Sequence, residues 1–381
     1  MKRGFLLRSN VSSSKTPAPK EKPPSEPPSL MITTSLPHDI IVNILARVSR
    51  SHYPKLSLVS KHFRSIVRSR EIYATRSSLG CTERFLYVVL YDLKTKEDRC
   101  YLLLRATTNG SQPHARLVLV PSLPAMPNRP YSSSFVAVGS KIYVFARSKE
   151  SNTTLSIDCE SHTVRRLPSM PEPLAHTVAD VIDGRIYVIG HHHRDIDKKM
   201  VVVFNTETQT WEPEKTRSDV EAGDTYHGSV VMAGKMYTKD FDSSYVYEPK
   251  ERRWETDEVM NSKEWRYGCV VDDVLYYYEC EEDDVERDQL RAFDRKERCW
   301  RVVKGLESLL RETRGSLWSH VESYGGNLAL FFPKGEGRRS EIWCAEISLE
   351  RRQGGEIWGK VEWCNCLVTG FQFTDSLEIV V

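Results

Sequence analysis

The sequence predicts a mainly β chain with a small helical domain near its N-terminus. Three observations carry this prediction: strand-like runs recur beyond residue 84, an apolar stripe with helical spacing lies between residues 35 and 73, and a proline-rich stretch precedes it. Helices place apolar side chains about every 3.6 residues, whereas buried strands are short β-branched and aromatic runs. These patterns divide the 381 residues into a tail (1–34), a helical domain (35–75) and a β domain (80–381).

The tail is predicted to be disordered. It contains six prolines and many serines but few large apolar side chains. Such a segment cannot bury enough apolar surface to offset the entropy that it would lose on ordering.

A first helix is expected to begin within the stretch "SLPHD" (35–39). Ser35 or Leu36 can cap it, Pro37 fits its first turn, and Asp39 complements the positive end of the helix dipole. Apolar side chains then recur at helical spacing along one stripe: Ile40, Ile41, Ile44, Leu45 and Val48.

Two further helical stretches are expected, one from about Pro54 and one from Val59. The second of these places Val59, Phe63 and Ile66 on one face. Residues 35–75 therefore form a predicted three-helix domain. A domain this small buries little of its own surface, so it needs either a neighbouring domain or a partner to cover its apolar faces.

Beyond residue 84 a five-fold repeat is visible. In each unit a glycine or acidic residue, which we call the anchor, opens a β-branched and aromatic run, as in "VGSKIYVFA" and "IDGRIYVIG". The anchors are Gly139, Gly184, Gly234, Asp273 and Gly326. They are spaced by 45, 50, 39 and 53 residues. A repeat of this length indicates stacked or ring-forming β units.

A second marker recurs inside the units. A tryptophan follows an aromatic residue by seven positions in "FNTETQTW", "YEPKERRW" and "FDRKERCW". Val164 follows Ile157 by the same interval in a degenerate copy. The polar residues between them predict a hairpin between the last two strands of a unit, with the indole packing on the neighbouring unit.

The helical residues resemble the F-box. The match runs in order through Leu36-Pro37, Asp39-Ile40, Ile44–Val48 and "LVSKHFRSIVRS" (58–69), with Phe63 in place of a tryptophan common in that family. The resemblance implies binding to a Skp-family adaptor. It places the adaptor-binding residues among Leu36, Pro37, Ile40, Ile44, Leu45, Val59 and Phe63.

The repeats resemble kelch repeats, which implies a β-propeller of four-stranded blades. We expect about six blades, one of them built from strands at both ends of the β domain. The double glycine usual after the second strand is missing: one unit keeps only Gly190 there, and Ala146-Arg147 replaces the pair in another. The second strand should therefore end with a different backbone geometry.

Together the two resemblances identify a plant-type F-box/kelch-repeat protein. They imply a non-catalytic substrate receptor of an SCF-type ubiquitin ligase, linked through the adaptor to cullin and RING subunits while the propeller holds an unidentified target protein. The alternative is a kelch scaffold or ligand-binding protein without ligase function. A propeller enzyme is a more distant possibility.

A target-binding rim is expected where the first strands of the blades begin. The predicted residues lie eight and seven positions before the anchors and include Tyr131, His176, Tyr226, His227, Trp265 and Arg266. Aromatic, histidine and arginine side chains are enriched at recognition surfaces. The alternative is that these residues cap strand ends and pack between blades.

Composition argues against several other classes. A net charge of +2 from 54 basic and 52 acidic residues gives no basic field for nucleic acid, and no apolar run reaches the about 18 residues that cross a membrane. The nine cysteines show no CxxC spacing, and "HHH" (191–193) lacks further ligands, so no cofactor or metal is expected. We expect the protein in the cytoplasm, the nucleus or both.

Overall fold

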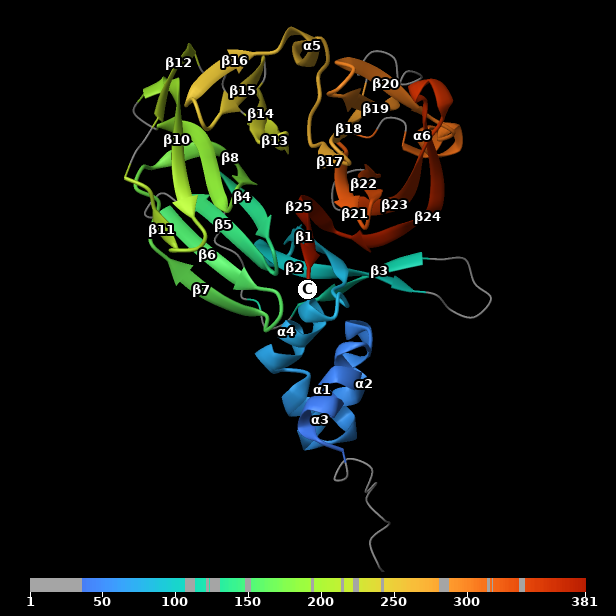
Figure 1. Cartoon of the computed structure of the whole chain (residues 1–381). Coiled ribbons are helices and arrows are strands. Elements are labelled where there is room, and N and C mark those ends of the chain that lie inside the picture. The colour runs from blue at the N-terminus through green and yellow to red at the C-terminus, as the bar shows by residue number, and fades with distance from the viewer. Residues whose placement is uncertain are drawn as a thin grey trace, which may run out of the picture.

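The computed structural model describes residues 36–106, 114–120, 123, 131–147, 152–192, 195–213, 216–221, 226–240, 243–280, 288–313, 316, 318–335 and 340–381. The predicted tail (1–34) lies outside the described residues. Figure 1 shows a ring of six β blades with a small helical unit projecting from its rim, as expected from the sequence.

The helical unit contains one more α-helix than predicted and, in addition, a short 3-10 helix. It comprises α1 (His38–Ala46), the short 3-10 helix η2 (Arg50–His52), α2 (Tyr53–Val59), α3 (Lys61–Ile66) and α4 (Arg70–Ser78). The additional helix α4 begins because the Ser69 hydroxyl accepts a hydrogen bond from the Ile72 N–H at 3.3 Å. It carries Ile72, which is fully buried, into the core of the unit.

Each blade is an antiparallel sheet whose first strand lies innermost. The first blade contains β25 (Phe371–Val380), β1 (Arg84–Asp92), β2 (Glu97–Ala106) and β3 (His114–Leu119). The second contains β4 (Tyr131–Val138), β5 (Lys141–Arg147), β6 (Asn152–Asp158) and β7 (Thr163–Leu167). The third contains β8 (Leu174–Ile182), β9 (Arg185–His192), β10 (Asp195–Asn205) and β11 (Thr210–Trp211), with β12 (Thr216–Glu221) also paired to β10.

The remaining three blades follow the same order. The fourth contains β13 (Tyr226–Met232), β14 (Lys235–Asp240), β15 (Ser244–Glu248) and β16 (Arg253–Thr256). The fifth contains β17 (Cys269–Val271), β18 (Val274–Glu279), β19 (Gln289–Asp294) and β20 (Cys299–Lys304), preceded by α5 (Glu258–Asn261) and followed by α6 (Glu307–Thr313). The sixth contains β21 (His320–Tyr324), β22 (Asn327–Lys334), β23 (Glu341–Arg351) and β24 (Ile357–Thr369), and β24 also pairs in parallel with β20.

The anchors form the hairpin turns between the first and second strands. All five have a positive φ, between 58° and 84°. In four of these two-residue turns the preceding residue also has a positive φ, as at Asp183-Gly184. This is the left-handed geometry of a type I′ turn, which glycine and aspartate tolerate better than most residues. The repeat is therefore set by turn chemistry.

The seven-residue marker pairs the third and fourth strands, as predicted. Phe204 lies opposite Trp211, Tyr247 opposite Trp254, and Phe293 opposite Trp300. The degenerate pair Ile157 and Val164 has the same register. The Trp211 ring also contacts Phe145 of the preceding blade, with ring centroids 5.6 Å apart. The indoles thus join neighbouring blades.

Strands from both ends of the β domain complete the first blade. β25 pairs antiparallel with β1, and Val381 and Glu83 exchange two backbone hydrogen bonds beyond the end of this ladder, at 2.8 and 2.9 Å. This confirms the expected closure of the ring, because strands from the two ends of the β domain are hydrogen-bonded to each other within one blade.

The helical unit and the propeller share one hydrophobic core. A single cluster of buried residues joins Ile41, Leu45 and Ile72 of the helices to Tyr87 of β1 and Ile142 of β5. Among the described residues, the helical unit therefore has no hydrophobic core separate from that of the propeller.

The helical unit lies at the rim of the ring and contacts the blade ends at one of its two faces, which we call the proximal face (Figure 1). Arg50 donates from Nη2 to the carbonyls of Cys159 and Glu160 in the turn between β6 and β7, at 2.5 and 3.1 Å. In an antiparallel blade the turn after the third strand lies at the same end as the hairpin after the first. The opposite, distal face therefore carries the starts of the first strands. None of the helices among the described residues is both long and apolar enough to span a membrane.

Candidate functional site

The first candidate site is an exposed apolar surface on α1. Leu36, Ile40 and Ile44 are 40%, 43% and 50% exposed. They are spaced four residues apart, so they follow one face of the helix and its N-terminal edge. The other face carries Ile41 and Leu45, which are both 4% exposed and belong to the shared core. The helix is thus apolar on two sides and buried on one.

Two more exposed apolar side chains lie at the end of α2. Leu58 is 77% exposed and Val59 is 57% exposed. We call Leu36, Ile40, Ile44, Leu58 and Val59 the helical apolar set. It accounts for five of the nine large hydrophobic side chains that are exposed in the described part of the chain. Such a concentration within 24 residues is typical of a protein interaction site.

The remaining predicted adaptor residues divide between surface and core. Pro37 precedes α1 as its N-cap and is exposed. Phe63 is partly buried and packs against the shared core, as Leu45 does from within it. Leu45 and Phe63 therefore position the helices, whereas Pro37 adjoins the helical apolar set. Leu58 was not among the predicted site residues; its exposed position at the end of α2 depends on how the helices pack.

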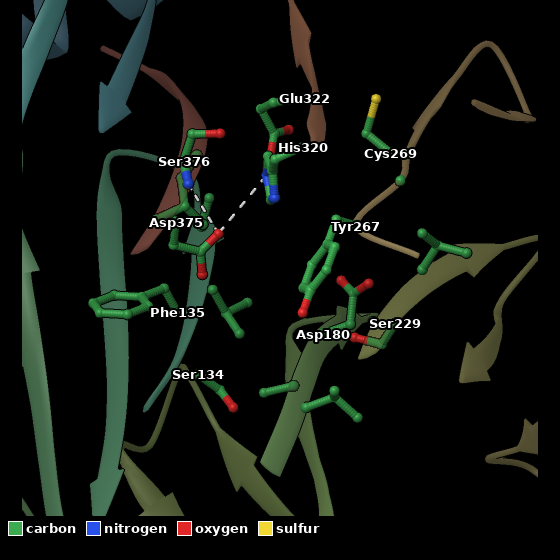
Figure 2. Close-up of a pocket in the computed structure, with 18 of the residues that line it drawn as sticks. Ser134, Phe135, Asp180, Ser229, Tyr267, Cys269, His320, Glu322, Asp375 and Ser376 are labelled. Atoms are coloured by element: carbon green, nitrogen blue, oxygen red, sulfur yellow. Dashed lines mark hydrogen bonds and ion pairs between the residues drawn. The ribbon is translucent and has the colours of Figure 1, made fainter. Parts of the chain in front are cut away.

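The second candidate site is the central channel of the propeller. It has a volume of about 660 Å³ and is lined by the innermost strand of every blade. Five lining residues lie six positions before the anchors: Ser133, Val178, Gly228, Tyr267 and His320. Figure 2 shows Tyr267 and His320 pointing into this space. A cavity of this size can hold a side chain or a small molecule.

The predicted target-binding residues lie beside the channel, at the distal face. His176 lies in β8, where its ring contacts that of His191, with centroids 6.5 Å apart. The side chain of Arg266 is 38% exposed. Tyr131, Tyr226 and His227 lie at the starts of β4 and β13, and their side chains are outside the described part of the structure.

Trp265 requires a correction. Its side chain has no solvent exposure, and its indole N–H donates to the Ser244 hydroxyl at 2.9 Å. It belongs to the core between the fourth and fifth blades. The predicted recognition role of Trp265 is therefore wrong, because a fully buried indole cannot contact a target. Tyr267, two positions later, is 45% exposed at the channel and was missed.

Comparison with known proteins gives the family. A model of the F-box domain matches residues 34–75, and a model described as FKB95, Kelch-repeats domain, matches residues 90–368. F-box/kelch-repeat protein At4g38940 of Arabidopsis thaliana is 44% identical over 96% of this chain and 98% of its own length. F-box/kelch-repeat protein At4g39240 of the same plant is 39% identical over 88% of this chain and 86% of its own.

The chain belongs to the F-box/kelch-repeat family. Its two domains are those of the substrate-adaptor proteins of SCF ligases, a family that is typically non-catalytic. An F-box implies binding to a Skp-type adaptor, and a kelch domain implies protein–protein interaction.

In this F-box/kelch-repeat protein the channel is acidic. Burial raises the pKa of Asp180 to about 7 and that of Glu322 to about 8. The Glu322 charge raises the pKa of Asp180 further, and the Glu378 charge does the same for Glu322. Burial also lowers the pKa of His320, which keeps its ring neutral near pH 7.

These raised pKa values predict that the F-box/kelch-repeat protein loses stability between pH 6.5 and pH 8. The native carboxyls hold protons that the unfolded chain has already released, so a rise in pH favours unfolding, by up to about 2 kcal/mol in the free energy of unfolding. Below pH 6.5 the lowered pKa values of His162 and His320 make the stability rise with pH. Above pH 8 the lowered pKa of Lys199 has the same effect. The predicted fall is therefore confined to the window between. Melting temperatures of wild type and of Asp180→Asn with Glu322→Gln, measured across this window, test the prediction. An equally steep fall in the double variant would contradict it.

A metal site does not emerge from the histidine run. His191 is 3% exposed within β9, and the side chains of His192 and His193 are outside the described part. Where the side chains are described, no three His, Cys, Asp or Glu residues are grouped so that they could hold an ion.

Proposed function

We propose that this protein is the substrate-recognition subunit of an SCF-type ubiquitin ligase. Its F-box binds a Skp-family adaptor and, through it, cullin and RING subunits, while the propeller binds the target protein at its distal face. The observation that carries the proposal is the helical apolar set, an unpaired apolar surface on a unit whose other side is already buried in the propeller.

The proposed role needs no catalytic group in this chain. A receptor that holds its target beside the charged conjugating enzyme converts a bimolecular encounter into an effectively intramolecular one. The gain is in the effective concentration of target lysines. Such a role acts in the cytoplasm, the nucleus or both.

The alternative function is a kelch scaffold or ligand-binding protein without a ligase. It would use the same propeller but leave the helical apolar set without an adaptor. Adaptor binding therefore discriminates between the two functions.

Replacing Ile40 and Ile44 together by alanine should abolish co-purification of the full chain with a Skp-family adaptor. Removing two apolar anchors from the centre of an interface commonly costs several kcal/mol of binding free energy. Alanine is the strongest helix former, so α1 should persist in the double variant. Adaptor retained on the tagged protein is measured by quantitative pull-down with purified components.

Val302→Ala is the matched control. Val302 is 38% exposed on β20 of the fifth blade, whereas the helices pack against the first and second blades. The control should bind adaptor as the wild type does, and both variants should keep the wild-type melting temperature. Undiminished adaptor binding by the folded double variant would overturn the assignment of this surface.

A further inference from the structure

The charged side chains that line the central channel are all acidic. Asp180 comes from β8, Glu322 from β21, and Asp375 and Glu378 from β25, and the lining residues that the structure describes include neither lysine nor arginine. The chain as a whole is nearly balanced in charge, with 54 basic and 52 acidic residues. The channel is therefore a local concentration of carboxyl groups within low-dielectric walls, and these groups attract a cation when they are ionised.

Two of these carboxyls have no lysine or arginine beside them among the described residues. Glu378 is neutralised by Arg84, at 3.1 Å, and also accepts from Ser323. Asp180 and Glu322, in contrast, each accept one hydrogen bond within the described structure, from the backbone N–H of the next residue, at 2.7 and 2.9 Å. Each carboxyl therefore keeps acceptor capacity for a further donor.

A buried hydroxyl and a ring nitrogen in the channel wall also lack partners. Ser376 is 1% exposed, and its Oγ has no hydrogen-bond partner in the described structure. The same holds for Nε2 of His320, which lies 3.8 Å from the Glu322 carboxylate and 4.0 Å from that of Asp375, too far for a hydrogen bond. Buried polar atoms are nearly always paired, so each of these two atoms can take a further hydrogen-bond partner in the channel. Figure 2 places Ser376, Asp375, His320 and Glu322 together at one side of the channel.

An aromatic ring completes the wall. Tyr267 is 45% exposed, and its ring centroid is 6.2 Å from that of His320. Figure 2 shows its hydroxyl and the Asp180 carboxyl directed toward the same part of the channel. An aromatic face beside carboxylates is the combination that recognises an organic cation, through cation–π attraction and charge-assisted hydrogen bonds.

We propose that the central channel binds an organic cation, an ammonium or guanidinium group, between Asp180, Glu322 and Tyr267. The cation is either a free amine or a basic side chain of a bound protein. This inference goes beyond the proposed function, because it names the chemistry that the propeller recognises; only its second source rests on that function.

Protonation should be coupled to this binding. Without a cation, burial raises the pKa of Asp180 to about 7 and that of Glu322 to about 8, and the charges of Glu322 and Glu378, respectively, raise them further. Near pH 7 Asp180 is therefore about half protonated and Glu322 is mostly protonated. The groups that face them are His320, Asp375 and Glu378, together with Tyr267 and Cys269. A bound cation favours the ionised carboxylates, so binding should release protons and should strengthen from pH 6.5 to pH 8.

Calorimetric titration of the full chain with N-acetylarginine amide at pH 8 and low salt tests the proposal. N-acetylcitrulline amide has nearly the same shape without the charge and serves as the matched neutral probe. We expect saturable binding of the arginine probe, at least tenfold weaker binding of the citrulline probe, and proton release when the titration is repeated in buffers of different ionisation enthalpy.

The double variant Asp180→Asn with Glu322→Gln should weaken binding of the arginine probe at least tenfold. Both replacements mimic the protonated carboxyls, so the fold should persist. Asp183→Asn, an exposed acid in the turn between β8 and β9 whose positive φ asparagine tolerates, is the control and should bind as wild type does. Equal binding by wild type and double variant, equal binding of the two probes, or no saturable binding of any cation would each overturn the proposal.

The source of the cation is decided by two further titrations. Spermidine binding more tightly than the arginine probe would assign the site to a free amine, whereas tighter binding of the peptide Ala-Ala-Arg-Ala-Ala would assign it to a protein side chain. Adaptor co-purification with the channel double variant should equal that of wild type, so failure here is distinguishable from failure of the proposed ligase role.

Discussion

Replacing Arg76 by methionine should lower the free energy of unfolding by about 3 to 5 kcal/mol, the usual effect of removing one partner from a buried ion pair. Arg76 is 1% exposed, and its guanidinium donates to the carbonyls of Ala46 and Val48 at 2.8 and 2.7 Å. It also donates to the Glu83 carboxylate at 2.8 Å. One side chain thus satisfies the C-terminal end of α1 and ties it to the residue before β1.

Thermal and denaturant unfolding of the full chain measure this loss. Arg68→Met is the matched control, because Arg68 is exposed on the same helical unit, and it should leave the melting temperature nearly unchanged. If both variants melted together, Arg76 would not be the link between the helices and the ring that its contacts indicate.

Replacing Glu346 by alanine should destabilise the ring closure by about 3 kcal/mol. Glu346 is 3% exposed and accepts hydrogen bonds from three partners. Arg105 of the first blade donates two, at 2.8 and 2.5 Å, Asn327 donates one at 2.7 Å, and the Trp363 indole donates one at 2.6 Å. The variant would leave the buried Trp363 indole without its acceptor and would remove the carboxylate that Arg105, 48% exposed, and Asn327 share at the junction of the first and sixth blades.

Glu350→Ala on the same strand is the control for this variant. Glu350 is exposed and pairs with Arg352, a surface contact of little energetic value. Hydrogen exchange in β1 and β25 should increase in the Glu346 variant and stay unchanged in the control. Unchanged exchange in both variants would mean that the strand pairing of β25 alone holds the ring closed.

Much of the fold could be predicted because it depends on local chemistry. The anchors mark turns that require left-handed backbone, and the pairs such as Phe204 and Trp211 mark hairpins of fixed length. Both signals survive in one sequence, since each depends on residues within a few positions of one another. The apolar stripe of α1 was likewise readable from its helical spacing, although the spacing did not distinguish the exposed Ile40 and Ile44 from the buried Ile41 and Leu45.

The channel residues could not be predicted because the innermost strands are irregular. The pairing register shifts between Tyr131 and Ser134 in β4, between Ala175 and Val178 in β8, and between Tyr226 and Gly228 in β13. A bulge reverses the alternation of side chains beyond it, so positions chosen before the bulge do not share the direction of those after it. The predicted rim therefore lies beside the channel lining.

The shared core could not be predicted from the sequence either. Ile41 and Ile142 are about a hundred residues apart, and their place in one buried cluster depends on how the helices pack on the ring. Sequence periodicity gives the face that a helix buries but not the partner that buries it.

Because that core is continuous, the helical unit and the propeller form one rigid body and not two domains joined by a flexible linker. Ile41, Tyr87 and Ile142 lie in one packed cluster, and Arg50 donates a hydrogen bond to the turn after β6. These contacts hold the ring in one orientation relative to the helices. A target seated in the propeller would be presented to the rest of a ligase at one fixed angle. Which of its lysines come within reach would then be decided by where they lie on its surface, and a target that bound equally well in a rotated pose would be held but left unmodified.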